Sequence, residues 1–181
     1  VDFFDEKRRD IFMRRTTMPA SAGFILLPYA NFGKVDNKGF EISINANKQI
    51  TKDFFISGMG NFTYAKNEIM EMDEAQGVIG TNRQRTGHSV DQHFGLIAER
   101  LFTVDDFEDA EAGVLREGIP HHTFSPVRPG DIKYEDVNGD GVIDALDYTA
   151  IGGTWDPKIV YGFGLNMQYK GIDLGLFFQG N

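Results

Sequence analysis

Hydrophobic and polar residues alternate with a period of two in several stretches of the chain, most clearly near its end. Over residues 159–170 every odd-numbered residue is apolar, and the even-numbered residues are mostly small or polar. Over residues 172–179 the even-numbered residues are the apolar ones. Between the two stretches stands Lys170-Gly171, a dipeptide suited to a tight hairpin. The pattern predicts two antiparallel strands, each with one apolar and one polar face.

Three earlier stretches predict further strands. Alternation is regular in Phe40–Asn47 and in Phe54–Tyr64, although Phe55 and Met59 stand on the otherwise polar face of the second stretch. A fifth strand is expected within Asp2–Arg15, where a run of charged residues blurs the alternation. The chain is therefore expected to be all-β, with about five strands.

The lengths of strands and connections favour a membrane barrel over a soluble sheet. The predicted strands run to about 10–14 residues, longer than the usual globular strand of roughly 5–6 and sufficient for the 9–11 or so that cross a membrane at a tilt. The connections alternate between long and short: 16–37, 49–53, 68–158 and the two-residue turn. Outer-membrane barrels alternate long extracellular loops with short periplasmic turns in this way. We therefore expect a fragment of an antiparallel transmembrane β-barrel with long extracellular loops; the alternative is a large soluble sheet covered on one face.

Composition narrows the class of protein. The 181 residues include 16 Phe, 21 Gly and no Cys, and the net charge is -9. The acidic balance argues against nucleic acid as a partner, and the lack of Cys excludes a disulfide framework. No apolar run reaches about 18 residues, so no transmembrane helix is expected, and nothing in the sequence reads as a signal peptide. Because the chain starts at Val1 and stops inside an apolar run, we expect it to be a piece of a longer protein.

Four segments in series resemble signature segments of the SusC/RagA family of TonB-dependent receptors, in its C-terminal part. They are Asn31–Glu41 (NFGKVDNKGFE), Gly60–Asn67 (GNFTYAKN), Arg128–Gly152 (RPGDIKYEDVNGDGVIDALDYTAIG) and Pro157–Phe163 (PKIVYGF). One segment departs from the family pattern, because Gly87–Phe102 has Glu-Arg where the family has a second Asp-Gly.

The resemblance implies a function in transport. It implies that residues 1–181 form part of a plugged barrel of about 22 strands in the outer membrane of a Gram-negative, Bacteroidetes-type bacterium. Such receptors import nutrients, oligosaccharides or peptides, with energy from TonB, which would contact a part of the parent protein absent from this chain. A SusD-like lipoprotein would form the lid, and loops 16–37 and 68–158 would contact the substrate or that lid. The resemblance implies no enzymatic activity.

The acidic segment Asp136–Asp147 has the residue spacing of a calcium-binding EF-hand loop. Oxygen-bearing side chains stand at positions 1, 3, 5, 9 and 12, a glycine at position 6 and a backbone carbonyl at position 7. The predicted ligands are Asp136, Asn138, Asp140, Val142, Asp144 and Asp147. The expected ion is a structural Ca²⁺ that orders the loop. The alternative is an acidic surface turn without an ion, since Asp147 is shorter than the usual Glu.

Two other groups of residues carry no prediction of chemistry. Ser89, Asp91 and His93 are of the types found in catalytic triads, but on a strand successive ones lie about 6.8 Å apart, too far for a proton relay. The neighbouring His121 and His122 would point apart in an extended chain, so no catalytic or transition-metal site is expected.

A rival interpretation comes from a different class of protein. The same strands and acidic loop would suit a secreted β-sandwich module for binding or adhesion, stabilised by calcium. The apolar face of residues 159–170 distinguishes the two. In a sandwich it is buried against a second sheet, and in a barrel it forms an exposed belt.

Overall fold

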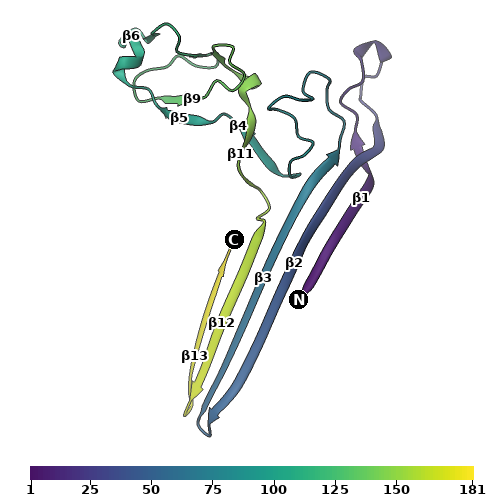
Figure 1. Ribbon diagram of the computed structural model, residues 1–181, viewed down its shortest axis with the longest axis vertical. Helices are drawn as coiled ribbons and strands as arrows, with labels where there is room; N and C mark the ends of the chain where they lie inside the picture. Colours follow the sequence, from purple (N-terminus) through teal and green to yellow (C-terminus); the bar gives the residue numbers. More distant parts are fainter.

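The main feature of the molecule is an antiparallel sheet of long strands. The computed structural model describes the backbone of residues 1–181 and all side chains but that of Ala20. Within these residues the large sheet has five strands, in the order β1-β2-β3-β12-β13. The strands are β1 (Asp2–Arg14), β2 (Tyr29–Thr51), β3 (Phe54–Glu71), β12 (Ile159–Tyr169) and β13 (Ile172–Gly180). They lie side by side as a wall, with the long connections gathered at one end (Figure 1). The five predicted strands are confirmed.

The long connection between β3 and β12 contains short elements, paired into two-stranded ladders. Its strands are β4 (Gln92–Gly95), β5 (Ala98–Leu101), β6 (Phe107–Asp109), β7 (Val114–Leu115), β8 (His121–His122), β9 (Ile132–Tyr134), β10 (Val142–Ile143) and β11 (Thr149–Thr154). The described helices are the 3-10 turns η1 (Ala20–Ala22), η2 (Val104–Asp106) and η3 (Ala145–Asp147). None of them has the length or apolar character needed to cross a membrane.

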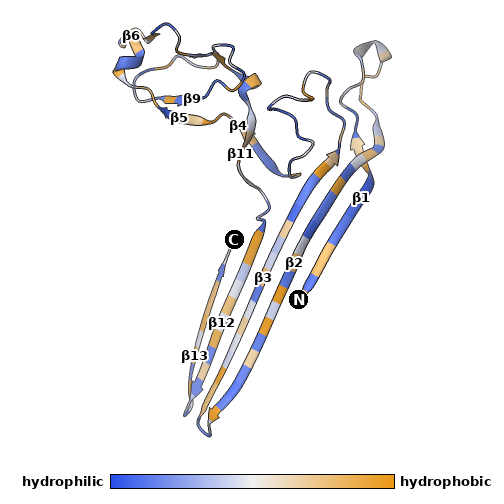
Figure 2. Cartoon of the chain, in the orientation of Figure 1, coloured by the Kyte–Doolittle hydropathy of each residue, from blue (hydrophilic) through white to orange (hydrophobic). Residues whose placement is uncertain are grey.

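The register of the large sheet gives it two chemically different faces. We call the face with Phe40, Phe62 and Phe163 the outer face and the opposite one the inner face. Aromatic rings of neighbouring strands meet on the outer face, with centroids 5.8 Å apart for Phe40–Phe62 and 5.1 Å apart for Phe163–Phe178. Apolar and polar residues alternate along each strand (Figure 2). The predicted alternation is therefore confirmed in three dimensions.

The outer face is uncovered, which decides between the two interpretations of the sequence. Tyr161 is 41% exposed, Phe163 51% and Phe178 54%, and among the described residues no second sheet packs on them. A soluble protein does not leave so large an apolar face in water. The β-sandwich interpretation is therefore wrong, and the exposed apolar belt is that of a lipid-facing barrel wall.

A tight turn joins β12 to β13, as the sequence predicts. Lys170 and Gly171 have φ values of 46° and 84°. Positive φ at both central residues matches the right-handed twist of the two strands, and glycine adopts it without steric cost.

Large apolar side chains on the inner face are accommodated by a glycine. Gly164 pairs with Met59 on β3 and with Phe177 on β13. A Cβ atom at Gly164 would lie 3.2 Å from Met59 Cγ and 3.3 Å from Phe177 Cδ2. Met59, an exception to the expected polar face, therefore lies with Phe177 in a small apolar patch over this glycine.

Strands β2 and β3 extend further into the loop region than their hydrophobic pattern indicates. β2 begins at Tyr29 inside the expected loop 16–37, and β3 continues to Glu71, past the expected start of the loop at residue 68. In these extensions apolar and polar residues do not alternate regularly, so no period of two marks them as strand. Ion pairs such as Arg9 Nη1–Asp36 Oδ1, at 2.6 Å, join the strands there.

We expect charge to be tolerated on one face of β12 only. In the full-length protein, Phe163→Arg places a cation near the middle of the apolar belt and should lower the free energy of unfolding in lipid vesicles by about 2–4 kcal/mol. Asn166→Arg, on the inner face of the same strand, should change it by less than about 1 kcal/mol. Urea titration of the vesicle-inserted protein measures both. Equal effects of the two substitutions would contradict the assignment of faces.

Candidate functional site

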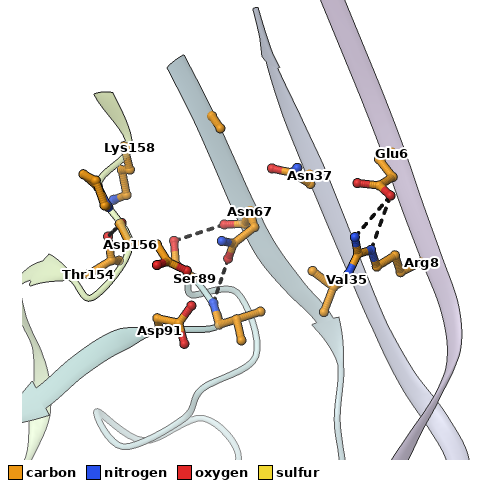
Figure 3. A pocket seen from close by; sticks show the side chains of 13 residues that line it. Glu6, Arg8, Val35, Asn37, Asn67, Ser89, Asp91, Thr154, Asp156 and Lys158 are labelled. Carbon is orange, nitrogen blue, oxygen red and sulfur yellow. Dashed lines mark hydrogen bonds and ion pairs between the residues drawn. The ribbon is translucent and has the colours of Figure 1, made fainter. Parts of the chain in front are cut away.

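A polar pocket lies on the inner face, at the end of the wall nearest the loops. Its volume is about 350 Å³. Glu6, Asn37 and Asn67 form one row across its floor, because Glu6 pairs with Asn37 and Asn37 with Asn67 in the strand register. Loop residues 89–91 and 154–158 complete its wall (Figure 3). We refer to this feature as the inner pocket.

Hydrogen bonds to β3 hold the loop segment in place beside the inner pocket. Ser89 Oγ donates to the backbone carbonyl of Asn67 at 3.0 Å, and the backbone N–H of Val90 donates to Asn67 Oδ1 at 2.8 Å. The N–H of Trp155 donates to the carbonyl of Asp91 at 3.1 Å, which joins the two loop segments. The pocket is therefore built partly by strands and partly by loop residues far away in the sequence.

Two carboxyl groups, of Asp91 and Asp156, face each other in the inner pocket (Figure 3). Burial raises the pKa of Asp91, and so do the hydrogen bond and the negative charge of Asp156. Lys158 and Arg8 supply donors in the same pocket. Closely spaced donors and acceptors of this kind suit a polar solute with hydroxyl or amide groups. Sequence reasoning missed this pair, because the two residues are 65 positions apart (156 − 91).

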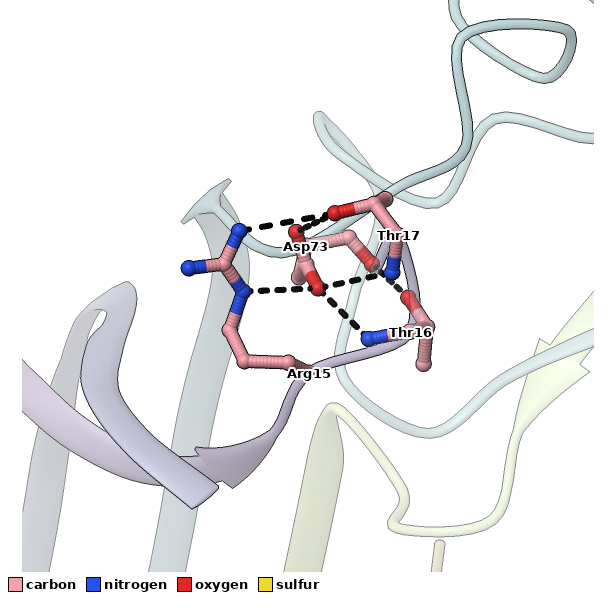
Figure 4. Close-up of polar contacts among 4 residues, drawn as sticks. All are labelled: Arg15, Thr16, Thr17 and Asp73. Atoms are coloured by element: carbon pink, nitrogen blue, oxygen red, sulfur yellow. Dashed lines mark hydrogen bonds and ion pairs between the residues drawn. The ribbon is translucent and has the colours of Figure 1, made fainter. Parts of the chain in front are cut away.

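A second polar cluster ties the loop after β1 to the end of β3 (Figure 4). Asp73 Oδ2 accepts hydrogen bonds from Arg15 Nε at 3.0 Å, from the N–H of Thr16 at 2.6 Å and from the N–H of Thr17 at 3.1 Å. The hydroxyl of Thr17 donates to Asp73 Oδ1 at 2.7 Å. Burial by itself would raise the pKa of Asp73, but the bonds from Thr17, Thr16 and Arg15 outweigh it and hold this pKa well below its ordinary value.

The loop between β3 and β12 has its own small core. Phe102, Phe107 and Val127 are buried together. Arg100 forms a two-pronged ion pair with Asp106, with both N–O distances at 2.6 Å. This bond and the backbone N–H of Thr103 hold the pKa of Asp106 well below its ordinary value, against the opposing effect of burial. The loop is therefore a packed structure that can present a defined surface.

The acidic segment folds into a closed turn held by its own carboxylates. Asp136 Oδ1 accepts from the N–H of Gly139 at 2.7 Å, and Asp136 Oδ2 from that of Gly141 at 2.7 Å. Asp147 is fully buried, and it accepts from the N–H groups of Val137 at 3.0 Å and Asp144 at 2.9 Å. Gly139 and Gly141 have positive φ values of 75° and 82°, which the sharp turn requires.

The other predicted ligands lie along the same turn. Asn138 Oδ1 accepts from the N–H of Asp140 at 2.9 Å, and Asp140 Oδ1 from that of Val142 at 2.9 Å. Among the described side chains, no three His, Cys, Asp or Glu groups converge as metal ligands. The turn around Gly141 is as expected, and calcium in it remains a prediction.

Of the residues from which no chemistry was predicted, Ser89 and Asp91 both line the inner pocket, whereas His93 and His122 contact other residues. Ser89 bonds to β3, Asp91 lines the inner pocket, and the ring of His93 lies 5.0 Å from that of Trp155. His122 packs its ring 4.9 Å from that of Phe124, in the small loop core. Each of these side chains has a structural contact of its own.

The wall and its loops define a class of protein, a segment of a transmembrane β-barrel with a polar inner face. No family model matches the chain. It is 29% identical over 190 residues to a TonB-dependent receptor of Formosa agariphila, in an alignment that covers 99% of the chain and 18% of that relative. It is 25% identical over 187 residues to the TonB-dependent receptor SusC of Bacteroides thetaiotaomicron, covering 96% of the chain and 16% of the relative.

The fold has a counterpart among solved structures. A chain in the structure of the RagAB peptide transporter matches 98% of this chain with a TM-score of 0.59 and 20% identity, over 18% of its own length. The resemblance to the SusC/RagA type is thereby confirmed, and the chain is related to a segment of these TonB-dependent receptors. It spans less than a fifth of the length of these relatives. The relatives are named as receptors and transporters, in line with the expectation that the chain is not an enzyme.

We expect Asp73 to control the order of the loop after β1. In the full-length protein, Asp73→Ala removes the acceptor for the N–H groups of Thr16 and Thr17. The cost should be about 2 kcal/mol of local stability, since hydrogen bonds to a carboxylate are lost while Arg15 stays partly solvated. Hydrogen exchange at these two amides should become about 30-fold faster. Asp105→Asn, an exposed aspartate in another loop, serves as the control.

The same amides should report the protonation of Asp73. Because its pKa is lowered by folding, the stabilisation is complete above the unfolded value of about 3.9 and is lost as the pH falls below it. After correction for intrinsic rates, exchange at Thr16 and Thr17 should be insensitive to pH between about 5 and 8 and accelerate below about 4. Exchange in Asp73→Ala that matches the unaltered protein would disprove the role of this cluster.

Proposed function

We propose that this chain forms part of the wall and the extracellular loops of a TonB-dependent importer in the outer membrane of a Gram-negative bacterium. The observation that carries the proposal is the two-faced wall, whose outer face is apolar and uncovered and whose inner face is polar. A sheet of this kind separates lipid from an aqueous passage. The names of the relatives, TonB-dependent receptors and a peptide transporter, support import as the activity.

The transported substrate belongs to the oligosaccharides or peptides in this proposal. The inner pocket supports this, since its carboxylates, amides and cations are suited to hydroxyl or peptide groups. TonB would act through a part of the protein outside this chain. A SusD-like lipoprotein would close the passage from outside, against the packed loops at the outer end of the wall.

Import should depend on the inner pocket. Deleting the full-length gene should abolish uptake of the labelled oligosaccharide or peptide that the bacterium normally takes up, and a protonophore should have the same effect. In the complemented strain, Asn37→Ala and Asp156→Ala should each raise the half-saturating substrate concentration about five- to tenfold, the effect of losing one hydrogen bond of about 1–1.5 kcal/mol.

Two controls make the uptake experiment decisive. Asp105→Asn removes a negative charge from an exposed loop position outside the inner pocket and should leave uptake unchanged. Immunoblots of outer-membrane fractions show whether each variant is present at the normal level. Normal uptake in the deletion strain would refute the proposed function, whereas normal affinity in both pocket variants would refute only the role of the inner pocket.

We also infer that the segment 136–147 binds Ca²⁺ as a structural ion. The spacing of Asp136, Asn138, Asp140, Val142, Asp144 and Asp147 supports this, and so does the tight turn at Gly141. Ca²⁺ would draw the oxygens of Asp136, Asn138 and Asp140 from their present amide partners toward one centre. The ion would stabilise the turn that docks β10 beside β8, where Ile143 is fully buried.

The calcium site should be weak and confined to the segment 136–147. In the full-length protein, terbium luminescence should reveal a site that Ca²⁺ displaces with a dissociation constant of about 10⁻⁴–10⁻³ M, the range of extracellular loops of this type. Asp140→Ala should lower the affinity at least tenfold, and Asp105→Ala should not. Absence of saturable binding at Ca²⁺ concentrations about tenfold above that range would remove the calcium site and leave the import proposal untouched.

A further inference from the structure

An exposed aromatic ring lies on the inner face of the wall, well away from the inner pocket. Phe177 of β13 pairs across the sheet with Gly164 of β12, and Gly164 pairs with Met59 of β3. Met59 and Asn67, which lines the inner pocket, are eight positions apart on β3 (67 − 59), or about 27 Å along the strand. The ring and the inner pocket are therefore separate features of the same inner face.

Two glycines of β12 allow the ring of Phe177 to lie down along the sheet. A Cβ atom at Gly164 would be 3.3 Å from Phe177 Cδ2, and one at Gly162 would be 3.5 Å from Phe177 Cζ. The far end of the side chain is therefore close to the backbone of β12 and does not point straight into the passage. Phe177 is nevertheless 61% exposed, so the side of the ring away from the sheet is open. We call Phe177 with Gly162 and Gly164 the aromatic platform.

Amide side chains border the aromatic platform on both sides. In the row toward the loops, Asn61 and Gln179 are the two strand partners of Gly162, and in the row toward the short turns stands Asn166. A hollow of about 420 Å³ adjoins the platform, and its lining includes Asn61, Gln179 and the ring of Phe177. Among the described residues that line this hollow, none has a charged side chain, whereas the inner pocket has both carboxylates and cations.

We infer that the aromatic platform is a second binding site on the passage, and that its ligand is the ring of a neutral pyranose sugar. The inference rests on the proposed import function and narrows the substrate to one that contains such rings. A pyranose with equatorial hydroxyls has C–H groups on its faces, which suit an aromatic ring, and hydroxyls around its edge, which suit amide donors and acceptors. The charged ends of a short peptide would find no partner on this uncharged surface.

Adjacent residues of β13 provide a matched test, because Phe177 belongs to the inner face and Phe178 to the outer face. The purified full-length protein in detergent micelles is titrated with methyl β-D-glucopyranoside, and saturation-transfer NMR detects contact of the protein with the C–H groups of the sugar ring. Phe177→Leu, which keeps an apolar side chain but loses the flat ring, should weaken binding about fivefold to tenfold, and Phe177→Trp should preserve it. Asn61→Ala should weaken it about fivefold through the loss of one hydrogen bond, and Phe178→Leu should leave it unchanged.

Two competitors and a labelling experiment identify the ligand and the open ring. Mannitol has hydroxyls without a ring face, and triglycine is a peptide, so neither should compete with the glucoside at equal concentration. Phe177→Cys should react with a charged thiol reagent added from water, and Phe178→Cys should not. Equal binding by the unaltered protein and Phe177→Leu, or competition by triglycine, would overturn the inference. So would an unreactive Phe177→Cys, since another part of the full-length protein would then cover the platform.

The import function is judged by a different result, the uptake of substrate by the deletion strain. Normal uptake in that strain together with binding of the glucoside by the purified protein would remove the import function and keep the aromatic platform as a sugar site. Lost uptake in that strain without binding of the glucoside would remove the platform alone.

Discussion

The structure depends on one constraint, the requirement that every backbone N–H and C=O group in a lipid environment be paired within the protein. A ladder of antiparallel strands meets this requirement and at the same time sends successive side chains to opposite faces. The register between β3 and β12 continues without a break from Tyr64–Ile159 to Phe54–Tyr169. Because it is unbroken, a period of two in the sequence becomes an apolar face and a polar face in space.

The same constraint divides the chain by distance from the membrane. Inside the apolar belt the outer-face residues are apolar, because they contact lipid. Beyond the belt both faces contact water. There strands β1 to β3 continue with ion pairs and with polar rows such as Glu6, Asn37 and Asn67. Ion pairs such as Lys38–Asp5 on the outer face and the inner pocket therefore lie on opposite sides of the same strands. One set of strands can serve lipid on one side and solute on the other.

The sequence predicted those features that a single local pattern encodes. The apolar belt, the turn at Lys170-Gly171 and the order of strands follow from alternation and turn chemistry, and the structure agrees. The extensions to Tyr29 and Glu71 escaped prediction because apolar and polar residues do not alternate regularly over them. The pairing of Asp91 with Asp156, and the convergence of Arg15 and Thr17 on Asp73, depend on how a long connection folds back, which no local spacing reveals.

The packing of the loop explains how so long a connection keeps a defined conformation. The connection after β3 is fixed to the wall near its start, where Ser89 and Val90 bond to Asn67, and near its end, where the carbonyl of Lys158 accepts from the N–H of Ala65 at 2.9 Å. Between these ends the core around Phe102 and the ion pair of Arg100 with Asp106 hold its shape. A surface so held loses little conformational entropy when a ligand or partner binds it, so contact energy is retained as affinity. In the proposed importer the wall would supply position and the loop would supply the surface for recognition.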